Sequence, residues 1–148
     1  MRETAYTIEA MQLEDIPEVL RLEREAFGQM AWHAGDFEAA IASKCDFPLV
    51  IRTTGLAGYA VLRIIAPEAE VENICVAPAC RRSGVGEALM EAMLRLAAER
   101  DAERIFLEVR AHNEPAKALY RKRGFIESYR RKNYYQGPTE DAIIMMKE

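Results

Sequence analysis

The stretch from Ala69 to Arg100 constrains the fold more than any other part of the chain. The apolar residues of 69–76 indicate a strand, which Ala77 and Pro78 would end. A loop with two glycines follows at 81–86, and from there apolar residues recur with helical spacing. This order places free backbone N–H groups and the positive end of a helix dipole at one point. We therefore predict that the loop binds an anion.

Two familiar phosphate-binding motifs do not fit the loop at 81–86. Its glycines let a ligand approach the backbone, and its arginines add positive charge. A Walker loop would continue with Gly-Lys-Ser/Thr, but Gly86 is followed by Glu87. A dinucleotide fingerprint would need a small residue where Leu89 stands. A Walker-type nucleotide site and a dinucleotide-binding site are therefore both disfavoured.

The whole chain alternates between strand-like and helical segments. We expect a mixed α/β sheet: an early meander, then strand–helix–strand–helix–strand. The expected strands are 6–10, 48–52, 56–65, 69–76, 104–110, 125–131 and 141–146. The expected helices are 15–27 capped by Asp15, 36–43 capped by Asp36, 84–100, and 114–123 between the caps Asn113 and Gly124.

Composition and charge exclude several classes of protein. A chain of 148 residues fits one domain, which we expect over residues 1–148. The net charge of −4 argues against a general nucleic-acid binder, and the longest apolar stretches are too short for a membrane span. Three cysteines without a C-x-x-C pair, and a start at Met1–Thr4 without a signal-peptide pattern, predict reduced thiols in a cytoplasmic protein. His33 and His112 lack metal-ligand spacing, so we expect no metal.

Arg81, Gly84 and Gly86 form the pattern Arg-x-x-Gly-x-Gly. This pattern resembles the acetyl-coenzyme A signature, Gln/Arg-x-x-Gly-x-Gly/Ala, of the GNAT family of N-acetyltransferases. Segments 107–113, 118–125, 131–135 and 140–145 add a similarity to the RimI-type ribosomal-protein-alanine N-acetyltransferases. The resemblance implies a GNAT-type fold, whose central sheet splays between the strands 69–76 and 104–110. It also implies that acetyl-CoA is the acetyl donor.

The resemblance further implies roles for individual residues. An N-terminal amine, with a pKa of about 7.7–8.0, must lose a proton before it attacks a thioester. Glu108 matches the family's general base, acting directly or through water, and Tyr120 matches the acid that protonates the leaving thiolate. Backbone N–H groups at the strand end would polarise the thioester. The implied cofactor-binding residues are Cys75, Val76, Arg81, Arg82, Ser83, Gly84, Val85, Gly86, Asn113 and Tyr120.

Each of these residues also has an ordinary structural interpretation. Glu108 lies on the strand face opposite the apolar residues, where Arg110 offers an ion-pair partner. Tyr120 is on an apolar helical stripe and is open to a packing role, and Asn113 to a role as helix cap only. An acyl-cysteine route through Cys75 or Cys80 is less favoured, because neither has a His or a basic group at a suitable spacing. We expect direct transfer in a ternary complex.

The resemblance places an acceptor peptide between two aromatic segments. One is the loop 28–35 with Trp32, and the other is a loop carrying Tyr134 and Tyr135. Glu72 and Asn73 on the preceding strand are expected near the amine. Packing of the tyrosines on the sheet is an equally open interpretation.

The Trp32 loop departs from the RimI-type pattern, which has Pro before the Trp and Ser or Thr after it. Ala31 and His33 occupy those positions here, so the lip of the peptide groove differs.

Three functions remain as hypotheses. The first is acetylation of a protein N-terminus, with the N-terminal alanine of a small-subunit ribosomal protein as the family's expected acceptor. The second is acetylation of a small-molecule amine, since the fold serves many acceptors. The third is a non-catalytic acyl-CoA-binding module, which the presence of both Glu108 and Tyr120 disfavours. We expect a monomer or weak homodimer with no direct nucleic-acid or membrane partner, and the role of the basic cluster Arg130–Lys132 stays open.

Overall fold

The computed structural model describes residues 6–136 and 138–148, so Met1–Thr4 of the expected start lies outside the described residues. Within them, seven strands form one sheet in the order β1-β2-β3-β4-β5-β7-β6. The strands are β1 (Thr7–Ala10), β2 (Asp46–Arg52), β3 (Leu56–Ile65), β4 (Glu68–Val76), β5 (Arg104–Arg110), β6 (Ile126–Tyr135) and β7 (Glu140–Lys147). Every neighbouring pair is antiparallel except β4 and β5, which are parallel. The expected mixed α/β sheet is confirmed.

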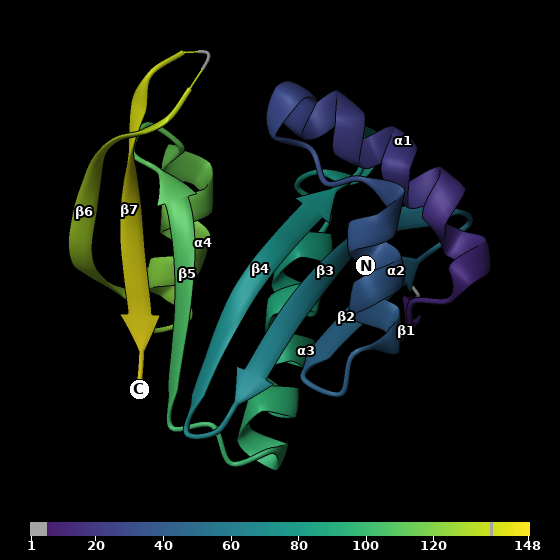
Figure 1. Ribbon diagram of the computed structural model, residues 1–148, viewed down its shortest axis with the longest axis horizontal. Coiled ribbons are helices and arrows are strands. Elements are labelled where there is room, and N and C mark those ends of the chain that lie inside the picture. The colour runs from purple at the N-terminus through teal and green to yellow at the C-terminus, as the bar shows by residue number, and fades with distance from the viewer. Residues whose placement is uncertain (1–5, 137) are drawn as a thin grey trace.

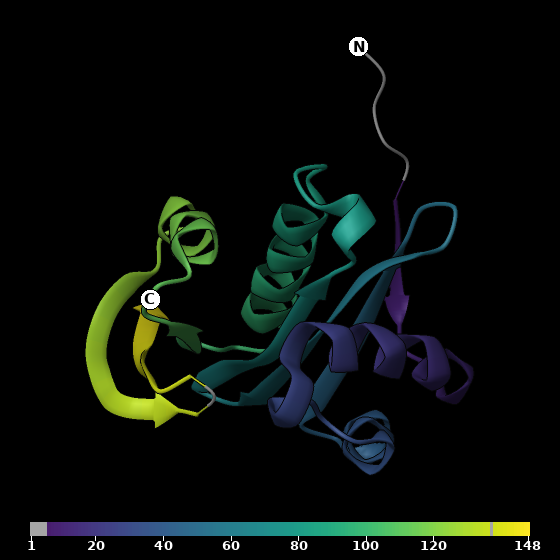
Figure 2. The same ribbon diagram turned by 90° about the horizontal axis from the view of Figure 1, so that it is seen from above.

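Helices cover both faces of the sheet. Figure 2 shows α1 (Ile16–Phe27) and α2 (Ala34–Ala42) on one face, and α3 (Val85–Glu99) and α4 (Glu114–Lys122) on the other. None of the helices in the described part of the chain is long and apolar enough to cross a membrane.

The sheet opens between β4 and β5. The two strands pair only from Glu68 opposite Arg104 to Val71 opposite Leu107. Beyond that point β4 continues to Val76 and β5 to Arg110, and Figure 1 shows the two strands diverging. The expected splayed central sheet is therefore present. An opening of this kind leaves backbone groups of both strands without their ladder partners.

A β-bulge in β4 changes which face its side chains occupy. Val61 of β3 pairs with Asn73 but the next residue, Leu62, pairs with Val71, so Glu72 is the extra residue. Val71 therefore packs in the hydrophobic cluster beneath α3, whereas Cys75 packs in the cluster beneath α1 and α2. Simple alternation would have placed these two residues on the same face.

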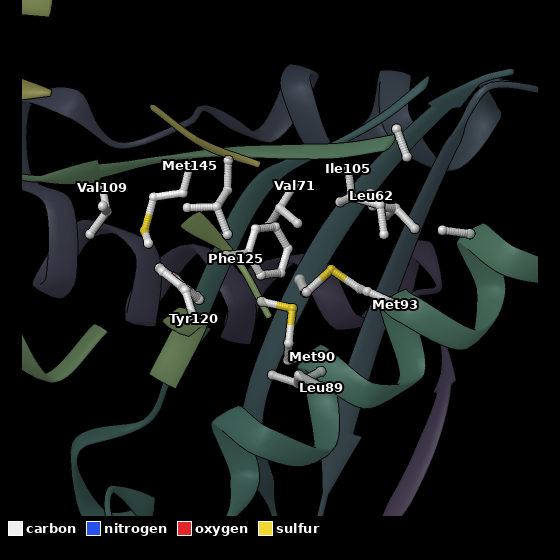
Figure 3. Packing of buried hydrophobic residues seen from close by; sticks show 14 of the residues in the cluster. Leu62, Val71, Leu89, Met90, Met93, Ile105, Val109, Tyr120, Phe125 and Met145 are labelled. Carbon is white, nitrogen blue, oxygen red and sulfur yellow. The ribbon is translucent and has the colours of Figure 1, made fainter. Parts of the chain in front are cut away.

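The larger hydrophobic cluster lies between the sheet and the helices α3 and α4. Figure 3 shows Leu89, Met90 and Met93 of α3 directed at Phe125 and the sheet. Phe125 is 1% exposed, and burial of a side chain of this size contributes roughly 1.5–3 kcal/mol. This packing holds α3, and the loop that precedes it, against the end of β4.

Three local predictions were wrong. The Asp15 side chain does not cap α1; it accepts the N–H of Gln12 at 2.8 Å and pairs with Arg52. Helix α2 begins at Ala34 rather than at Asp36, whose carboxylate accepts the His33 N–H at 2.8 Å. Asp15 is the third residue of a short 3₁₀ helix, Leu13–Asp15, and Asp36 is the third residue of α2. Each carboxylate thus acts at the third position of a capping box, although Gln12 and His33 stand where the sequence rule has Ser or Thr.

The third wrong prediction concerns the aromatic pair. Tyr134 and Tyr135 belong to strand β6, which extends to Tyr135, and not to a loop. A register shift between Arg131 and Tyr135, with Asn133 at φ 53°, lets the strand turn there without ending.

Candidate active site

A cavity of about 310 Å³ lies over the divergence of β4 and β5. It brings together Trp32 from the segment between α1 and α2, Asn73 from β4, and Glu108 from β5. All the acceptor-side residues expected from the sequence line it: Trp32, Glu72, Asn73, Glu108, Tyr134 and Tyr135. Positions that span more than 100 residues of sequence therefore meet in one hollow. We call it the acceptor cavity.

The carboxylate of Glu108 is only loosely paired. Its Oε1 lies 4.0 Å from Nη1 of Arg131, a distance beyond a normal hydrogen bond. The expected alternative partner was wrong, because the Arg110 guanidinium binds Glu140 at 3.2 Å and lies over the Tyr135 ring at 4.2 Å. Glu108 thus retains carboxylate lone pairs for another donor.

A second cavity, of about 660 Å³, lies where β4 ends and α3 begins. We call it the loop cavity. Most of the residues expected to bind the cofactor line it: Cys75, Val76, Arg81, Arg82, Gly84, Gly86, Asn113 and Tyr120. Ser83 and Val85 are not among its lining residues. The Val85 side chain is 1% exposed and packs in the core, which leaves its backbone for any ligand contact.

The two cavities share four residues, namely Phe27, Ile74, Asn113 and Tyr120. Asn113 Oδ1 accepts the N–H of Ala116 at 3.2 Å, so the predicted cap of α4 is confirmed. Tyr120 is 6% exposed and packs edge-on against Phe125, with 6.1 Å between ring centroids. Burial, followed by the nearby Tyr135, raises the pKa of Tyr120 to about 12, so its phenol keeps its proton at neutral pH. Tyr120 therefore packs in the core and also lines both cavities.

The conformation of the loop before α3 lets a ligand approach the loop backbone closely. Gly84 has φ +85°, a left-handed conformation that other residues rarely adopt, and its carbonyl accepts the Ala88 N–H at 2.9 Å. The Tyr6 hydroxyl donates a hydrogen bond to the Ser83 carbonyl and so links the N-terminal segment to the loop. The first N–H groups of α3 remain without intrahelical partners at this point.

Burial also raises the pKa of Tyr135 in the acceptor cavity to about 12, and two more groups in the cavities have shifted pKa values. Burial, together with a hydrogen bond to Asp46, raises the pKa of Glu72 to about 7. Burial also raises the pKa of the Cys75 thiol, which disfavours the thiolate that an acyl-cysteine route would need. No cluster of potential metal ligands occurs among the residues that the structure describes.

Aromatic rings form opposite walls of the acceptor cavity. Tyr134 and Tyr135 meet edge-on with ring centroids 5.2 Å apart. Trp32 packs against Phe37 at 5.1 Å, which seats its ring on α2. Tyr134 is 42% exposed, so the predicted packing of this tyrosine on the sheet is only partial.

Sequence reasoning missed one charged residue at the acceptor cavity, Glu23. It is 1% exposed and lines the cavity together with the apolar residues Phe27 and Met30. The signal was present, since Glu23 follows Val19 by four residues and therefore interrupts the buried stripe of α1.

Comparisons with known proteins agree with this geometry. Residues 13–125 match the model of the acetyltransferase (GNAT) family. The chain is 35% identical to the ribosomal protein bS18-alanine N-acetyltransferase of Escherichia coli K12, covering 94% of this chain and 95% of that protein. It is 30% identical to an N-alpha-acetyltransferase of Sulfurisphaera tokodaii, covering 95% of this chain and 91% of that one.

Solved structures show the same relationship. The Escherichia coli ribosomal-protein-S18-alanine N-acetyltransferase superposes with a TM-score of 0.87 at 32% identity, over 97% of this chain and 93% of that chain. The Ard1 protein of Thermoplasma volcanium gives 0.86 at 27% identity, over 97% of both chains. The chain therefore belongs to the GNAT family and is an N-acetyltransferase.

Proposed function

We propose that the protein transfers the acetyl group of acetyl-CoA to the N-terminal α-amine of a protein, with the N-terminal alanine of a bS18-type ribosomal protein as acceptor. One observation carries this proposal: two cavities enter the splayed sheet and meet at Tyr120. One contains the glycine loop and its arginines, and the other contains Glu108. This is the arrangement that a direct transfer between two bound substrates requires.

The loop cavity fits the pyrophosphate and pantetheine of acetyl-CoA. Backbone N–H groups at the start of α3, together with Arg81 and Arg82, supply positive potential for the phosphates. Gly84 and Gly86 carry no side chains, so a ligand can approach the loop backbone at these positions. Beyond Val71 the edge of β4 that faces β5 has no strand partner, so its N–H groups can bind the thioester carbonyl near Cys75 and Val76.

In this proposal the base lies in the acceptor cavity and the acid lies where the two cavities meet. Glu108, in the acceptor cavity, accepts a proton from the substrate amine, directly or through a water molecule. Tyr120, at the junction, donates its phenolic proton to the departing sulfur; with a pKa of about 12, the phenol carries this proton at neutral pH. Asn113 beside it contributes a polar contact to the donor.

The acceptor follows from the aromatic walls and from the relatives. Trp32, Tyr134 and Tyr135 line the acceptor cavity, and their rings offer apolar and hydrogen-bonding contacts to a peptide end. The relative from Escherichia coli is named for the alanine of ribosomal protein bS18, and it matches nearly the whole chain.

The test is acetylation, with radiolabelled acetyl-CoA, of peptides that differ only in the first residue. A peptide beginning with alanine should be the best acceptor, and the same peptide with a blocked N-terminus should be inert. Polyamines and aminoglycosides serve as the comparison. Acetylation of these amines without acetylation of any peptide would instead assign a small-molecule acceptor.

A further inference from the structure

Glu23 is a buried carboxylate to which the acid–base scheme assigns no role. It projects from α1 and is 1% exposed, yet it lines the acceptor cavity. Among the described residues it has no lysine, arginine or histidine within ion-pair distance. Burial of a carboxylate is costly unless hydrogen bonds replace its water. Its hydrogen bonds therefore identify the elements that depend on it.

Three donors converge on this carboxylate. The Tyr59 hydroxyl on β3 donates to Oε1 at 2.6 Å, and Asn73 Nδ2 on β4 donates to the same oxygen at 2.9 Å. The backbone N–H of Trp32 donates to Oε2 at 2.9 Å. Glu23 thus joins the wall of the acceptor cavity at Trp32 to its floor at Asn73.

The contact with Asn73 has a chemical consequence. A carboxylate only accepts hydrogen bonds, so the amide must turn its NH₂ group toward Glu23. The amide oxygen, which accepts a hydrogen bond from none of the described residues, is then on the opposite edge. Asn73 itself is 8% exposed and lines the acceptor cavity. Its position there results from the bulge at Glu72, which turns Asn73 toward α1.

We propose that Glu23 is a positioning residue for the acceptor: it orients the Asn73 amide so that the amide oxygen accepts a hydrogen bond from the substrate amine. This inference rests on the proposed function only in that the acceptor is a primary amine bound in this cavity. Glu23 touches neither reacting group in this scheme and acts through Asn73. The hydrogen bond from the Trp32 N–H to Glu23 also holds the Trp32 wall of the cavity in place relative to the Asn73 amide.

Glu23→Gln tests the proposal, because a glutamine can face Asn73 with its own NH₂ group and no longer dictates the amide orientation. We expect KM for the acceptor to rise roughly tenfold, the equivalent of one hydrogen bond, with kcat and the Kd of CoA nearly unchanged. Tyr59→Phe is the matched control, since it removes one donor from the same oxygen and leaves Asn73 in place. Its acceptor KM should stay within about twofold of the wild-type value.

Asn73→Ala provides a second, independent route. This variant should raise the acceptor KM as Glu23→Gln does, and the double variant should be no worse than Asn73→Ala alone. Equal KM effects of Glu23→Gln and Tyr59→Phe, additive effects in the double variant, or an unchanged KM in Asn73→Ala would overturn the proposal. If Glu23→Gln does not fold, an unchanged acceptor KM in Asn73→Ala still overturns the proposal.

The acceptor in these assays is the amine that wild-type protein acetylates best in the panel of peptides, polyamines and aminoglycosides. If that amine is a polyamine or an aminoglycoside, the peptide function fails while the comparison of variants still decides the role of Glu23. If wild-type protein acetylates no amine in the panel, both proposals are overturned.

Discussion

The guanidinium of Arg131 on β6 lies 4.0 Å from the carboxylate of Glu108 on β5. This pair is exposed at both ends, with 46% of the Arg131 side chain and 29% of the Glu108 side chain accessible, so it contributes little to stability. Its interest is chemical, because a partner at this distance leaves the Glu108 carboxylate able to accept a proton in the acceptor cavity.

Replacing Glu108 by Gln should remove the base and preserve the shape of the cavity. We expect kcat to fall by roughly 10²-fold or more, because a general base contributes about this much. The affinity for CoA, measured by calorimetry, should stay the same, since Glu108 does not line the loop cavity. Glu68→Gln, an exposed carboxylate on β4, is the control. Wild-type turnover by Glu108→Gln would remove this residue from the mechanism.

Tyr120→Phe separates the packing role of the ring from the role of the hydroxyl. The ring contact with Phe125 persists in the variant, so the thermal midpoint should change little. Turnover should fall by roughly 10²-fold, because the departing sulfur loses its proton donor. Circular-dichroism melts and steady-state kinetics on the same sample check both points. A loss of folding with normal turnover of the folded fraction would favour packing alone.

Gly84→Val should abolish CoA binding. Gly84 has φ +85°, which a β-branched residue avoids, and an added Cβ would lie 3.2 Å from the Tyr6 hydroxyl. The loop must therefore rearrange at the point where the phosphates bind. Gly55→Val is the matched control, because an added Cβ there would meet no atom within 4 Å and Gly55 lines neither cavity. Calorimetric titration with CoA should distinguish the two, and equal losses would contradict the explanation from backbone conformation.

Stability should depend on pH through Glu72. Burial raises its pKa in the folded protein from 4.5 to about 7, so the folded state binds this proton more tightly than the unfolded state. The resulting stabilisation is complete below about pH 4.3 and is lost as the pH rises through 7. Glu72 is partly exposed, and we expect an effect of only about 1 kcal/mol after solvent screening.

Urea unfolding at pH 5 and pH 8 measures this term. Wild-type protein should lose about 1 kcal/mol more between these values than Glu72→Gln, which has no titrating group at the position. The pKa of Asp46 is shifted down from 3.8, so this group gains its stabilising contribution at acid pH and adds no pH dependence between pH 5 and pH 8. Identical pH profiles for wild type and variant would show that Glu72 is not protonated in the folded state near neutrality.

Local patterns predicted the order of strand, loop and helix at 69–100 correctly, and the anion site in this loop stays a prediction. The strand, the Pro turn and the glycines of 69–86 predicted an anion site because each signal acts within a few residues. The caps were less predictable. Asp15 and Asp36 both satisfy the rule for an N-cap, but each occupies the third position of a capping box whose first residue, Gln12 or His33, is not the usual Ser or Thr.

The acceptor side depended on contacts between distant residues. Glu108 has Arg110 two residues away on the same strand face, and sequence distance favoured that pair, but Glu140 on β7 binds Arg110 instead. The bulge at Glu72 changed the face of Asn73, and no local pattern announced it. These outcomes depend on the register of neighbouring strands, which is a property of the assembled sheet.

The sequence by itself determined the order of elements, because this rests on local propensity, and it predicted an anion site at 81–86 and an acid–base pair from residue chemistry. Only the tertiary structure decided that β4 and β5 part beyond Val71 and Leu107. It likewise decided that Tyr120 stands where two cavities meet, and that Glu23 holds Asn73. The physical reason is that burial, hydrogen-bond pairing and cavity shape arise between residues far apart in the chain, and these become neighbours only when the sheet and its helices pack.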